Sequence, residues 1–390
     1  MTAYVSATAS AITPASGDRN WGRLMRSPST GRVEVPFSAR FRSARSGRNP
    51  DGTLVEGLRT GRSGREAVMS SDPPFAHLPV MVDSVVDLIL PVPPGVLLDA
   101  TLGGAGHARA ILDAAPHLSL IGLDQDPDAV AASRKVLAPY GDRARVERAR
   151  FDGIDQVLDR GGIDRLSAAL FDLGVSSPQL DRPDRGFSYR TAGPLDMRMG
   201  QEGTRSAAEV VNTWPEADLV QLFRANGEVR FARRIARAVI GARPIASTAE
   251  LAEVVRDAIP AAARRTGGHP ARRVFQAIRI AVNEELEVLP VALDAAIARL
   301  APGGRCVVLS YHSGEDRIVK DRFRAAATGG CICPPGLPCV CGAQPAVRLL
   351  TRGARRPAPG QTEANRRAES ARLRAVERLD SSHEPSRRTP

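Results

Sequence analysis

Short apolar runs alternate with amphipathic segments along most of the chain, beginning near His77. Continuous apolar runs predict buried strands, and apolar residues that recur every three or four positions predict helices. Their alternation is typical of an α/β fold, in which helices cover both faces of a parallel sheet. The expected strands are 96–99, 118–124, 145–151 and 168–172, and the expected helices are 80–90, 107–115, 127–138 and about 153–160.

The alternation stops after Asp172. From about 181 to 290 the pattern is helical throughout, which predicts a helical subdomain inserted into the α/β body. The helices expected in this insertion are 207–212, 216–224, 231–240, 248–259 and 271–287.

The pattern of the body returns with a helix at 288–300, a turn at Pro302-Gly303-Gly304 and a strand at 305–310. Two late β-like segments, 347–350 and 371–377, are expected to pair as an antiparallel hairpin at the edge of the sheet. The body is therefore predicted to be discontinuous. Its parts are 71–180 and 291–380, separated by the insertion 181–290, with a Cys/Pro-rich loop at 328–345 in the second part.

Residues 1–70 are rich in Ser, Arg, Gly and Thr and follow neither period, which predicts a disordered extension. An organelle transit peptide is one alternative, because such peptides are rich in Arg and Ser and poor in acids. A start codon placed too far upstream is another, since Met69 stands just before the first patterned segment.

The charge of +11 is concentrated at the two ends of the chain. Residues 1–70 and 343–390 each carry a net charge of +6, which leaves 71–342 at −1. Attraction to a polyanion would therefore come from the ends and from local patches of arginine. No apolar run approaches the roughly 18 residues of a membrane span, so we expect a protein that does not enter the membrane.

A glycine-rich loop follows the first strand, in the order Asp99-Ala-Thr-Leu-Gly103-Gly-Ala-Gly-His107. A strand, a tight loop and a helix N-terminus form the place where α/β folds hold nucleotide-like ligands. A dinucleotide fingerprint starting at Gly104 needs a third small residue where this chain has Arg109. The loop therefore favours S-adenosylmethionine over a nicotinamide dinucleotide.

Three of the expected strands end in an acid, namely Asp99, Asp124 and Asp172. Ligands in such folds lie over the carboxyl ends of the strands, so these side chains are candidates for one site. Asp124 is placed to bind ribose hydroxyls, and Phe151 is placed to lie against an adenine face. A single acid of this kind is often only a helix cap or a turn former.

The fourth strand leads into Asp172-Leu-Gly-Val-Ser176-Ser177-Pro178-Gln179. A turn of this type suits methylation of an exocyclic base amine, whose lone pair is delocalised into the ring. Acceptors that bind the amine N–H groups favour in-line attack and stabilise the charge that develops on nitrogen. An ordinary turn rich in Gly, Ser and Pro is the alternative.

Several further motifs resemble the RsmH (MraW) family, over about His77 to Leu379. They follow one another in the order expected of that family. The motifs are Asp172 to Asp181, Arg185-Gly-Phe-Ser188, Pro194-Leu-Asp-Met-Arg-Met199, Arg230-Phe-Ala-Arg-Arg-Ile-Ala236, His269-Pro270, Phe275 to Leu286 and Tyr311-His-Ser-Gly-Glu-Asp316 to Lys320.

The resemblance implies a bacterial, cytoplasmic enzyme that transfers a methyl group from S-adenosylmethionine to cytosine N4 in the decoding centre of 16S rRNA. Its partner would be 16S rRNA or the small ribosomal subunit, and a homodimer is compatible with it. The catalytic candidates are Asp172, Ser177 and Pro178, and the cofactor-binding candidates are Ala105, Gly106, His107, Asp124, Phe151, Asp172 and Gln179. A methyltransferase acting on another substrate and a non-catalytic ribosome assembly factor are the alternatives.

Two features of the resemblance lead to structural expectations. Family members often have glycine where this chain has Ala105, so a methyl is tolerated there only if φ at this position is negative. The insertion would supply RNA backbone contacts, and Phe187 or Tyr189 would stack on the target base. The arginines assigned to those contacts are Arg185, Arg198, Arg230, Arg233, Arg234, Arg272, Arg273 and Arg279.

Four of the five cysteines cluster as Cys331-x-Cys333-x5-Cys339-x-Cys341. They could form a small zinc site, although zinc ligands usually come in pairs separated by two to four residues. The alternative is a Pro/Gly-rich surface loop with free thiols. On spacing alone we favour free thiols, and we assign no metal ligand.

Overall fold

The computed structural model describes residues 79–200, 205–264, 269–334 and 339–380. All of them belong to one compact unit, Phe75–Pro390. The expectations for residues 1–70 concern a part of the chain outside these ranges.

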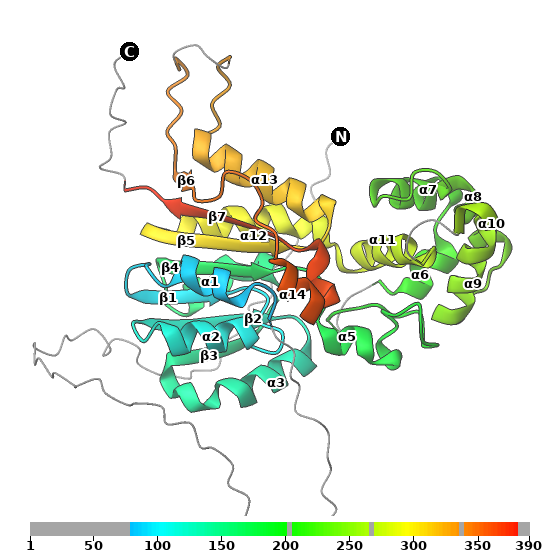
Figure 1. Ribbon diagram of the computed structural model, residues 1–390, viewed down its shortest axis with the longest axis horizontal. Helices are drawn as coiled ribbons and strands as arrows, with labels where there is room; N and C mark the ends of the chain where they lie inside the picture. The colour runs from blue at the N-terminus through cyan, green and yellow to red at the C-terminus, as the bar shows by residue number, and fades with distance from the viewer. Residues whose placement is uncertain (1–78, 201–204, 265–268, 335–338, 381–390) are drawn as a thin grey trace, which may run out of the picture. The chain divides into compact units, whose positions relative to one another are not determined.

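A seven-stranded sheet with the order β3-β2-β1-β4-β5-β7-β6 runs through the body (Figure 1). The first five strands along the chain are parallel, and β7 is antiparallel to both β5 and β6. The hairpin of the two late segments is therefore confirmed. The strands are β1 Gly95–Asp99, β2 Leu118–Asp124, β3 Ala144–Arg148, β4 Leu166–Asp172, β5 Leu300–Ser310, β6 Val347–Leu349 and β7 Arg372–Arg378.

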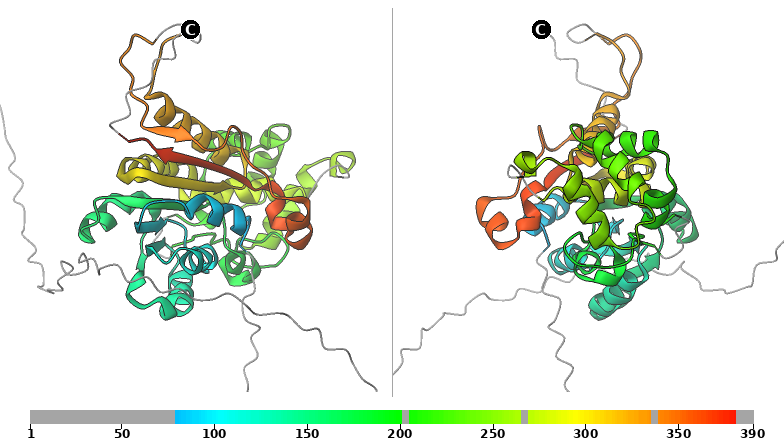
Figure 2. Two further views of the ribbon diagram at one scale, coloured as in Figure 1. Left: turned by 60° about the vertical axis from the view of Figure 1, so that its left-hand side comes forward. Right: turned by 90° about the vertical axis from the view of Figure 1, so that its right-hand side faces the viewer.

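Helices cover both faces of this sheet, as the sequence predicts (Figures 1 and 2). Neighbouring residues of β1 point to opposite faces, so Leu97 joins one buried cluster and Leu98 the other. The Leu97 face packs on α1 Val82–Ile89, α2 Gly106–Ala114 and the end of α3 Pro127–Leu137. The Leu98 face packs on α4 Ile154–Arg160, α12 Glu285–Arg299 and α13 Ser313–Thr328. The predicted α/β class is confirmed.

The third strand is shorter than predicted and ends at Arg148. The chain turns there, because the Ala149 N–H donates to the Asp124 carbonyl and the Arg150 guanidinium binds the Asp152 carboxylate. Phe151 consequently begins a short 3-10 helix, Phe151–Gly153, instead of closing the strand.

The Pro302-Gly303-Gly304 turn lies inside β5, and this strand starts five residues earlier than predicted. The pairing with β4 jumps from Leu166 opposite Leu300 to Ala168 opposite Arg305, so the extra residues bulge out of the ladder. A Cβ at Gly304 would lie 2.9 Å from the Leu166 carbonyl oxygen. Only glycine allows this close approach of the two strands.

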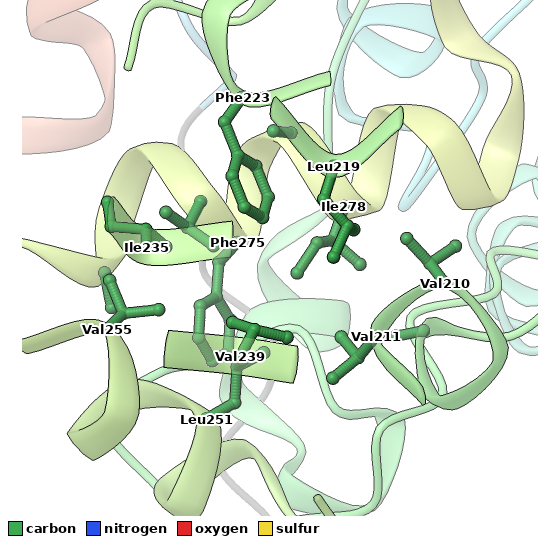
Figure 3. Packing of buried hydrophobic residues seen from close by; sticks show 14 of the residues in the cluster. Val210, Val211, Leu219, Phe223, Ile235, Val239, Leu251, Val255, Phe275 and Ile278 are labelled. Carbon is green, nitrogen blue, oxygen red and sulfur yellow. The ribbon is translucent and has the colours of Figure 1, made fainter. Parts of the chain in front are cut away.

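The helices of the insertion form a separate apolar core (Figure 3). Its buried residues run from Phe187 to Val282, and Phe223 at its centre is 1% exposed. The helices are α6 Ala207–Thr213, α7 Glu216–Ala225, α8 Ala232–Gly241, α9 Thr248–Ala258, α10 Ala261–Arg264 and α11 Ala271–Asn283. The domain boundaries themselves stay a prediction.

The helix predicted at 271–287 ends at Asn283, because Glu284 has a left-handed backbone with φ 54°. The chain changes direction at this residue and continues as α12. Two further helices are short. They are α5 Ser177–Asp181, which follows β4, and α14 Pro359–Ala364, which lies between β6 and β7 in the chain. Among the described residues, no helix combines the length and the apolar character needed to cross a bilayer.

Candidate functional site

The loop from β1 to α2 ties together the ends of three neighbouring strands. The Thr101 hydroxyl accepts a hydrogen bond of 2.6 Å from the Asp172 N–H at the end of β4. The Gly103 N–H donates to the Asp124 carboxylate at the end of β2, at 2.8 Å. Asp99, at the end of β1, accepts from the Thr101 N–H at 3.1 Å. The three acids found in the sequence therefore belong to one hydrogen-bonded neighbourhood.

Asp172 is the centre of this neighbourhood. Its Oδ1 accepts a hydrogen bond of 2.7 Å from the Tyr311 hydroxyl, and its Oδ2 lies 3.4 Å from His107 Nε2. Burial opposes the charged form of His107, but the neighbouring carboxylates of Asp172 and Asp99 outweigh this effect and raise its pKa above 6.5. Tyr311 was not assigned a role from the sequence, although it opens one of the motifs that carry the resemblance.

The imidazole of His107 has unused hydrogen-bonding capacity. It is 5% exposed, its Nδ1 has no hydrogen-bond partner within the described part of the chain, and its Nε2 has only the 3.4 Å contact with Asp172. A buried polar atom without a partner is costly, so a ligand that bonds to this ring would be favoured here.

Two carboxyls of the site are buried, which makes their ionised forms costly. Burial raises the pKa of Asp99 from 3.8 to about 7 and that of Asp124 from 3.8 to about 6. The charge of His107 and the Thr101 N–H oppose this shift at Asp99, and backbone N–H groups oppose it at Asp124. Buried carboxylates with so little compensation favour a positively charged ligand, or one rich in hydroxyl donors.

Gln179 belongs to a second hydrogen-bond network, which joins α5 to the start of α3. Its Oε1 accepts from the Ser176 N–H at 2.9 Å, and its Nε2 donates to Asp126 Oδ2 at 2.9 Å. Asp126 also accepts from Arg185 at 2.8 Å and caps α3 through the Asp128 N–H. The polar atoms of the Gln179 side chain thus have protein partners, and its contact with a cofactor stays a prediction.

Ser177 and Pro178 are the first two residues of α5. Ser176 caps that helix, in a capping box with Gln179. Gly174, in the turn before them, has φ +97°, which lets the chain pass beside the Tyr311 ring. The catalytic roles of Ser177 and Pro178 stay predictions.

Tyr311 is held in place by the start of α13. The Glu315 carboxylate accepts from the Tyr311 N–H at 2.7 Å, and the His312 ring caps the helix by accepting from the Gly314 and Glu315 N–H groups. Glu315 is 2% exposed, and a hydrogen bond from His312 together with the charge of Arg279 keeps its pKa low despite burial. These contacts explain why the Tyr311 motif needs its histidine and glutamate.

Ala105 does not meet the expectation of a negative φ. Its backbone is left-handed, with φ 60° and ψ 25°, and its side chain is fully buried. The methyl packs among apolar residues of α1, α2 and the sheet. Burial of this methyl offsets part of the strain, which glycine at the same position would avoid.

This balance predicts the effect of substitutions at Ala105. Ala105→Gly would relieve roughly 1–2 kcal/mol of strain, while losing about 0.8 kcal/mol of methyl burial and about 0.4–1 kcal/mol through the freer unfolded chain. We therefore expect almost no change in stability. Ala105→Val should destabilise by about 1–3 kcal/mol through overpacking alone. Urea unfolding measures both, and an equally stable valine variant would contradict the tight packing around Ala105.

Several residues assigned to RNA contacts have other partners. Phe187 is 5% exposed in the core of the insertion, so the expected stacking on a base is wrong for this residue. Arg279 forms two hydrogen bonds of 2.8 Å with Glu285 and is only 14% exposed, and Arg185 binds Asp126. Tyr189 stacks on His269 with ring centroids 4.5 Å apart. Exposed side chains remain at Arg230, Arg233, Arg234, Arg272 and Arg273.

Phe151 lies close to the site without a polar role. Two residues before Phe151, the Ala149 N–H donates to the Asp124 carbonyl. The Phe151 ring meets the Phe171 ring edge-on, with centroids 6.2 Å apart. It is half-buried against the core of the sheet. Its contact with an adenine stays a prediction.

Comparisons with known proteins identify the family to which the chain is similar. The sequence model of a family described as the MraW methylase family matches residues 74–379. A protein of Thermobifida fusca named Ribosomal RNA small subunit methyltransferase H is 53% identical over 313 residues, covering 78% of this chain and 94% of that protein. Proteins of the same name are 53% identical in Acidothermus cellulolyticus and 48% identical in Heliobacterium modesticaldum, covering 98% and 99% of those proteins.

Proposed function

This chain belongs to the MraW methylase family, and from that membership we propose that it methylates cytosine N4 in 16S rRNA of the small ribosomal subunit. The relatives it resembles are named as methyltransferases of this RNA, and they align with it over nearly their whole length. The observation that carries the proposal is the joining of Asp99, Asp124 and Asp172 by one loop at the ends of β1, β2 and β4.

The methyl donor of this enzyme is S-adenosylmethionine, which supplies a methyl group on a positively charged sulfur. The residues present fit such a group, because burial makes the ionised forms of Asp99 and Asp124 costly without a positive charge nearby, and His107 Nδ1 has no hydrogen-bond partner among the described residues. We assign Asp124 to the ribose hydroxyls and the backbone at Ala105-Gly106 to close approach. Glycine is needed at position 106, because a Cβ there would lie 2.7 Å from Pro79 Cγ.

Asp172 is the residue we assign to the cytosine amine. Its carboxylate can accept an amine N–H, which directs the nitrogen lone pair toward the methyl group and stabilises the charge that forms on nitrogen. The Tyr311 hydroxyl fixes one oxygen of this carboxylate, so the other is oriented without a further loss of entropy. Ser177 and Pro178 begin the helix that follows and are assigned to the same amine through the turn they form.

The exposed arginines of the insertion are assigned to the RNA backbone. Arg230, Arg233 and Arg234 lie at or near the start of α8, and Arg272 and Arg273 lie in the first turn of α11. Arginine suits phosphate because its planar guanidinium binds two oxygens at once. Cytoplasmic location follows from the substrate, and a homodimer stays a prediction that sedimentation of the purified chain would test.

The proposal is tested by nucleoside mass spectrometry of 16S rRNA. A strain lacking the gene should lose the N4-methyl group on one cytidine, and the wild-type chain should restore it. Purified chain should also methylate either naked 16S rRNA or assembled small subunits, and comparing them identifies the substrate form. Unchanged methylation in the deletion strain would exclude this substrate, and a chain that does not bind S-adenosylmethionine in calorimetry would be a non-catalytic factor.

Replacing Asp124 by alanine should weaken donor binding by roughly 1–3 kcal/mol, the cost of leaving hydroxyl partners unpaired. The same change frees the Gly103 and Asp126 N–H groups, which adds disorder in the loop. Isothermal calorimetry measures the loss. Asp113→Ala, which removes an exposed carboxylate from α2, is the matched control and should bind normally. Normal affinity in the Asp124 variant would remove this residue from the donor site.

Donor affinity should also rise with pH. The Asp99 carboxyl has a pKa of about 7 and the Asp124 carboxyl a pKa of about 6 because both are buried, so both ionise as the pH rises from about 5 to 8. Each ionisation adds attraction for a cationic donor, and deprotonation of His107 removes a repelling charge. The stability of the free protein depends on pH in the opposite direction from donor affinity. The contribution of Asp99 to the free energy of unfolding is full below pH 3.8 and is lost as the pH rises through its pKa of about 7.

Calorimetry at several pH values, on the wild type and on Asp99→Asn, measures this dependence. The variant should show a shallower rise, because its amide does not titrate. Identical slopes in the two proteins would mean that Asp99 does not sense the donor charge.

A further inference from the structure

The four clustered cysteines bring their sulfur atoms to one point. Cys339 Sγ lies 3.4 Å from Cys331 Sγ, 4.0 Å from Cys333 Sγ and 3.5 Å from Cys341 Sγ. The Cys341 and Cys331 sulfurs are 3.6 Å apart, and all four lie within 4.8 Å of one another. They stand in the segment between α13 and β6 (orange in Figure 1).

These distances match the edges of a tetrahedron of thiolates around one metal ion. Zinc binds thiolate sulfur at about 2.3 Å, which places the sulfurs of an ideal tetrahedral site roughly 3.8 Å apart. Four of the six sulfur–sulfur distances are 3.4–4.0 Å, close to that value, and no pair is more than 4.8 Å apart. They are far longer than the roughly 2.05 Å of a disulfide bond. All four cysteines are free thiols, so none is already used in a disulfide.

The backbone supports the cluster on both sides. The Ala346 N–H donates to the Ala326 carbonyl, and the Gly330 N–H donates to the Ala325 carbonyl, so both ends of the segment are anchored on the last turn of α13. The Val340 N–H points at Cys333 Sγ at 3.4 Å, a contact that stabilises a thiolate. The side chains between the paired cysteines, Ile332 and Val340, point outward and are each 89% exposed.

We propose that Cys331, Cys333, Cys339 and Cys341 bind one zinc ion as a tetrahedral tetrathiolate site. The four thiols lose their protons to solvent when the metal binds, and no redox change is involved. The unusual spacing within each pair made this interpretation unfavourable from the sequence. The fold brings the four sulfurs together despite this spacing, because the two pairs of cysteines lie on opposite arms of one loop. The ion would close this loop beyond the end of α13, and the site is independent of the methyl-transfer centre.

Metal analysis of the full chain tests the proposal. The protein is produced with zinc in the medium and purified without oxygen, and its metals are measured by inductively coupled plasma mass spectrometry. We expect one zinc ion per chain in the wild type and a loss of about tenfold or more in the double variant Cys331→Ser/Cys341→Ser. Ile332→Ser and Val340→Ser, which change the same loop without removing a ligand, should keep full occupancy. Cys306→Ala, at the buried fifth cysteine, should also keep it.

A second measurement does not depend on any variant. Metal-free wild-type chain is titrated with Co²⁺ alone, which gives the visible bands of tetrahedral cobalt and the charge-transfer band of cobalt thiolate when it occupies such a site. Saturation at one equivalent, reversed by zinc, is the expected result. Absence of these bands, iron in place of zinc, or a mass lower by the hydrogens of two disulfides in the reduced preparation would each overturn the proposal.

Discussion

Replacing Asp172 by asparagine is expected to lower kcat for methyl transfer by about 10²–10³-fold, the usual cost of losing a preorganised group that stabilises developing charge. The amide keeps the size of the side chain, and it can still accept from the Tyr311 hydroxyl. It removes the negative charge that faces the amine. Donor affinity should change far less than kcat, because we assign Asp172 mainly to the acceptor base.

Single-turnover methylation of small-subunit RNA measures this effect, and calorimetry with S-adenosylmethionine checks donor binding. Asp164→Asn is the matched control, since Asp164 is exposed just before the opposite end of β4 and lies far along the strand from the site. Its activity should equal that of the wild type. If Asp172→Asn retained full activity, the acceptor would have to be positioned by another group.

A variant of Tyr311 distinguishes the positioning role of this hydroxyl from the catalytic role of Asp172. Tyr311→Phe removes the hydroxyl that fixes Asp172 Oδ1 but leaves the carboxylate charge in place. A loss smaller than that of the Asp172 variant therefore follows from the geometry. Tyr311 directly follows β5, so the Asp172 carboxylate is oriented by a residue 139 positions away in the chain.

The local features of the fold could be predicted because short-range periodicity encodes them. β2 Leu118–Asp124 has the predicted bounds, and the strands ending at Asp99 and Asp172 differ only at their first residues. These strands are almost entirely buried and read as continuous apolar runs. The three acids could be placed together because neighbouring parallel strands end at one edge of the sheet.

The misplaced side chains depend on contacts between distant segments. An exposed arginine and a buried, paired one look alike in a sequence, so Arg185 and Arg279 were assigned to RNA although each has a carboxylate partner. Ala105 was expected to avoid a left-handed backbone, because the packing that stabilises its methyl comes from α1 and the sheet. The cysteine geometry likewise depends on how the two arms of one loop meet.

Asp126 is a buried carboxylate whose loss should destabilise the protein strongly. Its carboxylate is 3% exposed and joins three segments, since it caps α3, accepts from Gln179 of α5 and pairs with Arg185. Asp126→Ala leaves the Arg185 guanidinium, 15% exposed, without its close partner. Breaking a buried ion pair from one side costs about 3–5 kcal/mol. We expect the lower end, because Arg185 keeps bonds to the Arg198 and Met199 carbonyls.

Asp128→Ala is the control for this experiment, because the two residues share the same helix turn and Asp128 also pairs with an arginine, Arg182, at 2.6 Å. Asp128 is 54% exposed, so its loss should cost only about 0–1 kcal/mol. Asp126→Asn should fall between the two, since asparagine caps a helix as well as aspartate but carries no charge. Urea unfolding followed by circular dichroism orders the three variants. Equal stability of Asp126→Ala and Asp128→Ala would mean that burial adds nothing to this ion pair, and that the turn carrying Gln179 is held by other contacts.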